Sequence, residues 1–173
     1  MRNYLSKPNW CVIVACLIVP RPMALPATPT FFARYDYMGL DSLGVQVADT
    51  NGDGIPDLIA DGDGIIVLLG NGDGTFHTGP VSYTTVFGGT FVAADMNGDG
   101  KVDVVLPGNE GGPYYPVGIA VCLGNGDGTF QSGTFYEVPD SGVDFVVVRD
   151  FNGDGIPDVA AAGASGVEPR ART

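Results

Sequence analysis

The stretch VADTNGDGIPDLIA, at Val47–Ala60, occurs in three copies and decides the fold of this chain. The second copy is AADMNGDGKVDVVL, at Ala93–Leu106, and the third is VRDFNGDGIPDVAA, at Val148–Ala161. In each copy an acidic loop follows one apolar segment and leads into another. Self-similarity of this kind is typical of repeat architectures.

A second motif alternates with the first. LGNGDGTF occurs at Leu69–Phe76 and again at Leu123–Phe130. The two motifs together predict repeats at about residues 43–88, 89–142 and 143–168, the last of them incomplete. The second repeat is longer because it carries the inserted segment GNEGGPYYPVG, at Gly108–Gly118.

Each repeat holds short apolar segments bounded by Gly, Asp and Asn turns, which is typical of consecutive antiparallel hairpins. Unbroken apolar runs such as Ile65–Leu69 and Phe145–Val148 indicate strands covered on both faces. No segment has a sustained helical period. The expected strands of the second repeat are Phe91–Ala94, Val102–Leu106, Ile119–Leu123 and roughly Gly133–Val138.

We therefore expect an all-β fold built from β-propeller blades of four antiparallel strands, present as a partial segment of about 2.5 blades. A stack of small sheets or a β-sandwich is the structural alternative.

The repeated loop reads D-x-N-x-D-G-x-x-D, and its side-chain ligands are all hard oxygens, which suit Ca²⁺ better than zinc or copper. Positions 1, 3 and 5 can converge, glycine at position 6 turns the chain, and position 7 offers its carbonyl. The aspartate at position 9 closes the site and begins the next strand. The predicted ligands of up to three Ca²⁺ ions are Asp49, Asn51, Asp53, Ile55 and Asp57; Asp95, Asn97, Asp99, Lys101 and Asp103; and Asp150, Asn152, Asp154, Ile156 and Asp158, with Ile55, Lys101 and Ile156 acting through backbone carbonyls.

Two other interpretations of this loop are weaker. An EF-hand requires glutamate at position 12, where this chain has Ala60, Leu106 and Ala161. Plain Asn-Gly and Asp-Gly turns do not require four oxygens in this pattern, and clustered carboxylates repel one another unless a cation offsets them.

The LGNGDGTF copies lack two of the four side-chain ligands. When their Asn and Asp are aligned to positions 3 and 5, position 9 is His77 in the first copy and Gln131 in the second. We expect both copies, and also Asp61–Gly64, to be hairpin turns.

These motifs resemble the FG-GAP/VCBS-type repeats of bacterial surface proteins, which are related to the propeller of integrin α subunits. The resemblance covers Val45 to about Gly166. It implies seven-bladed propellers, Ca²⁺ in the loop between the first two strands of a blade, and roles in adhesion or ligand binding. The literal Phe-Gly and Gly-Ala-Pro signatures are replaced by FVAAD and FVVVRD, so integrin-like ligand recognition is not carried over.

The repeats are too few for a closed propeller of roughly four to eight blades. We therefore expect a truncated or partial product, or association with other chains through unpaired blades.

The first 27 residues differ from the rest. A basic start and the apolar run WCVIVACLIV, at Trp10–Val19, predict a secretory signal peptide at 1–27, followed by the repeat segment at 28–173. Ten residues do not span a bilayer. A lipoprotein signal with lipidated Cys16, or a buried first strand, is the alternative. We expect a secreted, periplasmic or cell-surface protein, in which Cys122 remains as an unpaired core side chain.

The net charge of −12, with two lysines and six arginines, argues against nucleic acid or an anionic membrane as partner. We expect an exported calcium-binding module with a structural, adhesion or ligand-binding role toward a protein or carbohydrate. Tyr114 and Tyr115, in the inserted segment, are the first choice for a contact surface, and an ordinary long hairpin loop is the alternative.

Enzyme activity is not expected. No nucleophile motif is present, and the single histidine, His77, lies next to a turn. The alternative function is a polysaccharide lyase or hydrolase built on a propeller, although its candidate carboxylates are already engaged in the loop pattern.

Overall fold

The structure is a computed structural model, and it describes residues 12–15, 34–37, 44–61, 64–82, 84, 86–87, 90–110, 116–138 and 142–163. These residues contain strands and turns but no helix, so the all-β prediction is confirmed. Accordingly, the described part of the chain offers no helix that could cross a membrane. The strands are β1 (Val12–Ala15), β2 (Arg34–Tyr37), β3 (Val45–Ala48), β4 (Asp57–Asp61), β5 (Ile65–Gly70), β6 (Phe76–Ser82), β7 (Val86–Phe87), β8 (Val92–Ala94), β9 (Asp103–Glu110), β10 (Val117–Cys122), β11 (Thr134–Glu137), β12 (Phe145–Arg149) and β13 (Asp158–Ala162).

The strands form antiparallel sheets that follow the sequence repeats. The first sheet has the order β3-β4-β5-β6. The second sheet has β8, β9, β10 and β11 as its four blade strands, with β7 added to the far end of β9. The third repeat contributes the hairpin β12-β13, which we call the third hairpin. This arrangement matches partial propeller blades, as the sequence predicts.

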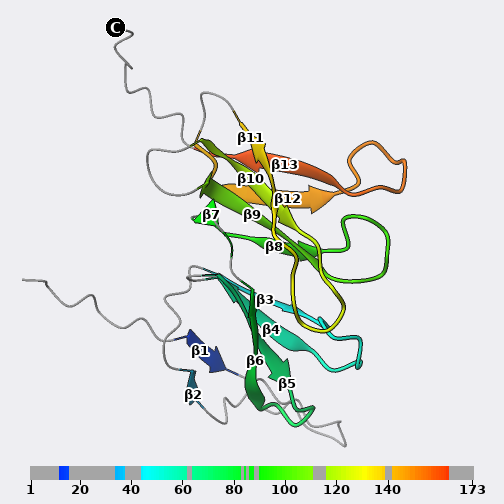
Figure 1. Cartoon of the computed structure of the whole chain (residues 1–173). Coiled ribbons are helices and arrows are strands. Elements are labelled where there is room, and N and C mark those ends of the chain that lie inside the picture. The colour runs from blue at the N-terminus through cyan, green and yellow to red at the C-terminus, as the bar shows by residue number, and fades with distance from the viewer. Residues whose placement is uncertain are drawn as a thin grey trace, which may run out of the picture.

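The two sheets and the third hairpin stack in layers (Figure 1). One core lies between the sheets, where Ile59 and Val67 of the first pack against Val104 and Cys122 of the second. Another core lies between the second sheet and the hairpin, where Val105 meets Val146. The second sheet is therefore apolar on both faces, as unbroken apolar runs predict.

Two expectations about strands are corrected. The inserted segment is not loop throughout, because β9 continues through Gly108–Glu110 and β10 begins at Val117. The apolar run of β12 was expected to be covered on both faces, but Phe145 and Val147 are exposed. Within the described residues, no further sheet lies on that side of the hairpin.

The single cysteine of the repeat region behaves as predicted. Cys122 is a free thiol in the core between the sheets, and burial raises its pKa to about 11.

The predicted leader and the predicted contact loop are mostly outside the described residues. β1, within residues 1–27, pairs with β2 from Val12↔Tyr37 to Ala15↔Arg34. This pairing does not test cleavage, so the signal peptide and the domain boundaries stay predictions. Cys16, Tyr114 and Tyr115 lie outside the described residues.

Candidate metal centre

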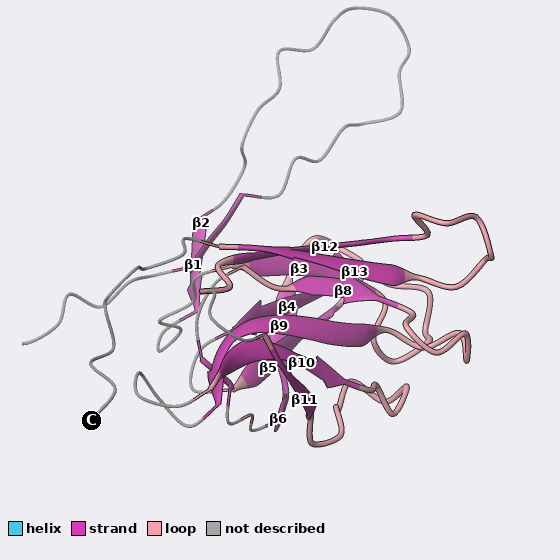
Figure 2. Cartoon of the chain, turned by 90° about the horizontal axis from the view of Figure 1, so that it is seen from above, coloured by secondary structure: helices cyan, strands magenta, loops and turns pink. Residues whose placement is uncertain are grey.

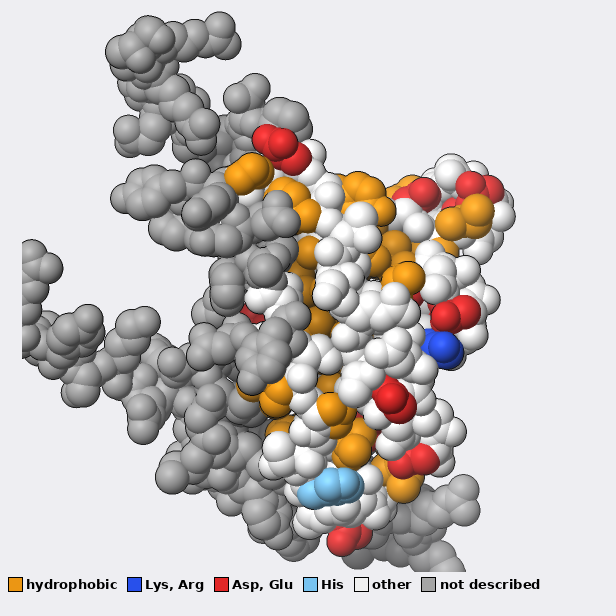
Figure 3. Space-filling view, in the orientation of Figure 1, with side chains coloured by type: hydrophobic (Ala, Val, Ile, Leu, Met, Phe, Trp, Pro, Cys, Tyr) orange, Lys and Arg blue, Asp and Glu red, His pale blue; other side chains and the backbone are white. Residues whose placement is uncertain are grey.

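The three acidic loops occupy equivalent places in the fold. Residues 49–57 join β3 to β4, residues 95–103 join β8 to β9, and residues 150–158 join β12 to β13. All three project from one common end of the layers (Figure 2), and acidic side chains lie along that edge (Figure 3). In each loop the ninth residue is also the first residue of the next strand, as predicted.

The first aspartate of each loop is held by backbone amides. In the first loop the two carboxylate oxygens of Asp49 accept hydrogen bonds from Gly52 N and Gly54 N, each at 2.8 Å. Both glycines have a positive φ, of 77° and 81°, which points their amides at the carboxylate. The hydrogen bond from Gly54 is the largest cause of a lowered Asp49 pKa.

The third and fifth residues form a local pair. Asn51 Oδ1 accepts a hydrogen bond from Asp53 N at 2.9 Å, and Asn51 Nδ2 donates to Asp53 Oδ2 at 3.0 Å. Asp53 Oδ1 also accepts from Ile55 N at 2.7 Å. The equivalent bonds occur in the other two loops, at Asn97, Asp99 and Lys101 and at Asn152, Asp154 and Ile156.

In the first two loops the ninth aspartate is buried and accepts hydrogen bonds from its own loop and from the segment that begins the LGNGDGTF turn. Asp57 accepts hydrogen bonds from Thr50 N at 2.9 Å, Thr50 Oγ1 at 2.5 Å and Gly70 N at 2.9 Å. Asp103 accepts from Met96 N and Gly124 N, each at 2.8 Å. Both carboxylates are 0% exposed.

The close approach at these carboxylates depends on glycine. A Cβ atom at Gly70 would collide with the carbonyl oxygen of Pro56, and one at Gly124 would collide with that of Val102. The third strand can therefore bring its amide to the buried carboxylate only if glycine stands at this position. Gly70 and Gly124, the first glycines of the two LGNGDGTF copies, thus each donate to the acidic loop of their own repeat.

Within the described part of the chain, the third loop lacks an equivalent of the hydrogen bond that Gly70 N or Gly124 N donates to the ninth aspartate. Asp158 accepts a hydrogen bond from Phe151 N at 2.9 Å, but no described residue stands where Gly70 and Gly124 stand. Asp158 is half-buried, and Ile156 is 60% exposed. In the first loop the equivalent Ile55 packs over Gly70 and Gly72 instead.

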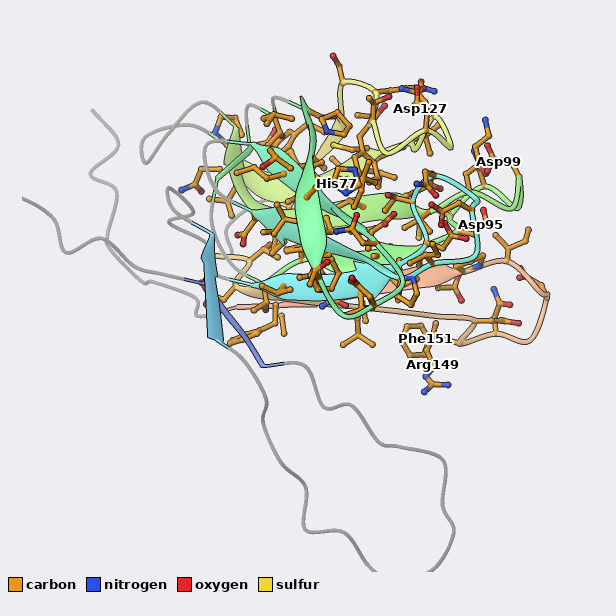
Figure 4. All side chains as sticks on the ribbon, turned by 90° about the horizontal axis from the view of Figure 1, so that it is seen from below. His77, Asp95, Asp99, Asp127, Arg149 and Phe151 are labelled. Atoms are coloured by element: carbon orange, nitrogen blue, oxygen red, sulfur yellow. The ribbon has the colours of Figure 1, made fainter. Side chains whose placement is uncertain are left out.

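The LGNGDGTF copies are hairpin turns, as predicted. Asn71 N bonds to Thr75 O, and Asn125 N bonds to Thr129 O, each at 2.9 Å. His77 Nδ1 lies 2.8 Å from Asn71 Oδ1 within the first turn, and Figure 4 shows it well away from Asp95 and Asp99. The Asp61–Gly64 hairpin is confirmed by the pairing of Asp61 with Ile65.

The side-chain donor atoms of each loop are carboxylate and amide oxygens. Across the described residues, no three acidic, His or Cys side chains are placed to hold a metal ion together. The oxygens are nevertheless of the type Ca²⁺ takes, and every loop offers the same set. The residues therefore fit calcium in the chemistry of their donor atoms.

Three features of the site were not predicted from the sequence. Position 4 of the loop is a glycine with positive φ. Position 2 donates its backbone amide to the aspartate at position 9, and Gly70 N or Gly124 N donates a further hydrogen bond to the same aspartate. The N-G-D-G spelling, constant in all three loops, was the signal for the first of these.

Comparisons with known proteins agree with the repeat pattern. A family model for the FG-GAP-like repeat matches residues 49–106 and 95–161. Among solved structures, the chain is similar to an Agrocybe aegerita lectin that recognises non-reducing terminal N-acetylglucosamine, at 32% identity and a TM-score of 0.49. That match covers 68% of this chain and 31% of the lectin chain, so this chain spans about a third of the lectin's length. No curated protein matches the chain.

Proposed function

The chain belongs to the FG-GAP-like repeat family, and on that premise we propose that it is an exported β-propeller repeat module whose loops bind Ca²⁺ and whose fold the ions stabilise. Its proposed role is structural, adhesive or ligand-binding, toward a protein or a carbohydrate. The loop oxygens are the proposed ligands, and a bound cation would supply positive charge that offsets their mutual repulsion.

The observation that carries this proposal is the burial of Asp57 and Asp103. A buried carboxylate is costly unless hydrogen bonds and opposite charge compensate it. Amides supply the hydrogen bonds, but no basic side chain in the described part of the structure forms an ion pair with either group. A divalent cation in the adjoining loop would provide the missing charge.

Calcium suits this loop better than other common cations. The side-chain donors are carboxylate and amide oxygens, whereas zinc prefers nitrogen and sulfur. Mg²⁺ demands near-ideal octahedral geometry, while Ca²⁺ accepts six to eight oxygens in flexible arrangements. A short loop whose donors are carboxylate, amide and backbone carbonyl oxygens fits the more tolerant ion.

A metal that stabilises the fold also matches the predicted export of the chain. Exported proteins with small cores commonly rely on disulfides, and Cys122 is free and buried. At free Ca²⁺ about tenfold above Kd, each site adds roughly 1.4 kcal/mol to the free energy of unfolding. N-terminal sequencing of the secreted product would test the predicted leader at residues 1–27.

Calorimetric titration with Ca²⁺ tests the proposed site, and the chain offers a matched control. Asp53, in the first loop, and Asp73, in the first turn, are both exposed and both accept a backbone hydrogen bond from the residue two positions on. We expect Asp53→Asn to weaken or abolish one binding event and Asp73→Asn to leave binding unchanged. Absence of calcium binding, or equal effects of the two substitutions, would contradict the proposal.

A further inference from the structure

The third hairpin, the last layer of the stack in Figure 1, has one edge that no described strand pairs. In the first repeat β4 pairs with β3 on one side and with β5 on the other, and in the second repeat β9 pairs with β8 and β10. β13 occupies the same place in its repeat, yet among the described residues it pairs with β12 alone. We call the side of β13 opposite β12 its outer edge. An unpaired strand edge offers backbone donors and acceptors to a further strand.

The exposure of β13 agrees with an unpaired outer edge. Residues 58–60 and 104–106 are buried in the first two repeats, where β5 or β10 lies beside them as the third strand of the repeat. At the equivalent positions of β13, Val159 is half-buried and Ala160 and Ala161 are exposed. The difference follows the presence of a third strand, because the repeats share the other features of this segment.

The ninth aspartate of the third loop indicates what such a strand would carry. Asp57 and Asp103 each accept a hydrogen bond from the amide of a glycine at or just after the end of the third strand. Asp158 accepts one from Phe151 N, and no described glycine stands at the third-strand place. A carboxylate can accept several hydrogen bonds. A strand that placed a glycine beside Asp158 would therefore supply the donor that the other two repeats have.

The second sheet also exposes the apolar surface that a third strand would cover. On the first sheet, Ile65 and Val67 are 2% and 0% exposed, packed in one cluster with Cys122 of β10. Ile119 and Val121 are the equivalent residues of the second sheet, counted from the first glycine of LGNGDGTF, and they are only half-buried. A third strand beside β13 would bury them as β10 buries the first sheet.

We propose that the outer edge of β13 binds an extended polypeptide segment that pairs antiparallel to it, turns apolar side chains to the second sheet and places a glycine beside Asp158. Strand addition of this kind takes its affinity from backbone hydrogen bonds and its specificity from alternate side chains. The chain defines the pattern, because Ile65–Gly70 and residues 119–124, IAVCLG, fill this place in their own repeats. Residues 164–173 do not contain this pattern.

The glycine of the bound segment should decide recognition. A Cβ atom at Gly70 would collide with the carbonyl oxygen of Pro56, and one at Gly124 would collide with that of Val102. Pro157 stands at the same repeat position as Pro56 and Val102. A segment with alanine in place of the glycine would meet the carbonyl oxygen of Pro157 and should bind more weakly.

Fluorescence anisotropy of a labelled peptide measures this binding. The peptide has the sequence of residues 119–130, IAVCLGNGDGTF, and is titrated with the full chain under reducing conditions, in Ca²⁺ and in chelator. We expect saturable binding to the wild type. The peptide with alanine at the position of Gly124 should bind about tenfold more weakly, because it loses the close approach to Asp158. The protein is the same in both titrations, so a change in its folding does not enter the comparison.

A variant of the chain maps the binding to the outer edge. The carbonyl oxygen of Ala162 accepts a hydrogen bond from Asp144 N, on the side of β12. Neighbouring residues of a strand direct their backbone groups to opposite edges, so Ala161 directs its N–H to the outer edge. Ala161→Pro removes that donor at an edge where proline is tolerated, and it should abolish peptide binding. Ala161→Ser keeps the donor and should bind like the wild type, and circular dichroism compares the folds of the two variants.

Three results would overturn the proposal. These are the absence of saturable peptide binding, equal affinity of the alanine peptide, and undiminished binding to a folded Ala161→Pro variant. Self-association of the chain that Ala161→Pro abolishes, without any peptide binding, would instead assign the outer edge to a second copy. The contact consists of backbone groups and apolar side chains without a metal ion, so this proposal and calcium binding can fail separately.

Discussion

The first and third acidic loops share their sequence pattern and their internal hydrogen bonds, yet they differ in how they are anchored. In both, the first aspartate accepts amides of the two glycines, and asparagine pairs with the fifth-position aspartate. Asp57 is buried against Gly70, whereas Asp158 is half-buried and bonds to Phe151 alone among the described residues. The loop shape is therefore local, and the burial of its last ligand depends on the rest of the blade.

The largest expected effect is the difference in stability loss between removing a buried and a half-buried ninth aspartate. Asp103→Ala leaves the amides of Met96 and Gly124 unpaired in the interior, at about 1–3 kcal/mol for each buried donor. Asp158→Ala exposes its single partner, Phe151 N, to water and should cost clearly less. Urea unfolding of both variants measures the difference, and equal losses would refute the role given to burial.

The next effect tests the glycine whose amide donates a hydrogen bond to the buried ninth aspartate. Gly124→Ala forces a Cβ against the carbonyl oxygen of Val102, and we expect a loss of about 1–3 kcal/mol. Gly153→Ala, in the third loop, meets open space and should lose stability through its positive φ alone. Thermal unfolding compares them. If Gly124→Ala were as stable as wild type, the close approach would be irrelevant.

Calcium affinity should be higher in the first two loops than in the third. The loops at residues 49–57 and 95–103 hold their ninth ligand in place, whereas Asp158 has to be ordered on binding. We expect the variant Asp154→Asn to change calcium-dependent stability less than Asp99→Asn does. Differential scanning calorimetry at fixed Ca²⁺ compares them, and a larger effect at Asp154 would reverse the proposed ranking.

A smaller effect concerns the seventh position. Ile55 packs on Gly70 and Gly72 but is only half-buried, so Ile55→Ala should cost about 1 kcal/mol, less than the roughly 2–5 kcal/mol of a fully buried isoleucine. Ile156→Ala removes a side chain that is largely exposed and should stay within about 0.5 kcal/mol of wild type. Chemical denaturation of the pair checks this.

The smallest difference is expected in acid, where the two loops should behave alike. Backbone amides lower the pKa of Asp49 and of Asp150 below the ordinary value of 3.8. Because the folded pKa is the lower one, the stabilisation is present above pH 3.8 and is lost as the pH falls through the folded values. Carboxyl NMR titration should find both groups lowered, and an ordinary pKa at Asp150 alone would show that this loop is not formed locally.

The sequence predicted what depends on local repetition. Family membership and the all-β blades follow from the D-x-N-x-D-G-x-x-D and GNGDGTF motifs, and the positions of the hairpin turns follow from Asn-Gly and Asp-Gly. The ligand lists could be written because each loop carries its oxygens in one short segment. Calcium binding itself stays a prediction.

Features that join distant segments were not predictable in the same way. The bond from Gly70 N to Asp57 spans 13 residues, and the bond from Gly124 N to Asp103 spans 21 because of the insertion. The exposure of Phe145 and Val147 was missed because an apolar run does not reveal whether a following sheet exists. Burial at such positions depends on neighbouring sheets that a single segment does not encode.

The most direct test of calcium stabilisation is the unfolding temperature of the full chain in Ca²⁺ and in chelator. With free Ca²⁺ well above Kd, we expect the midpoint to be roughly 5–15 °C higher than in chelator. Asp53→Asn should reduce this increase, and Asp73→Asn should preserve it. An identical midpoint in the two conditions would contradict the claim that calcium holds this fold together.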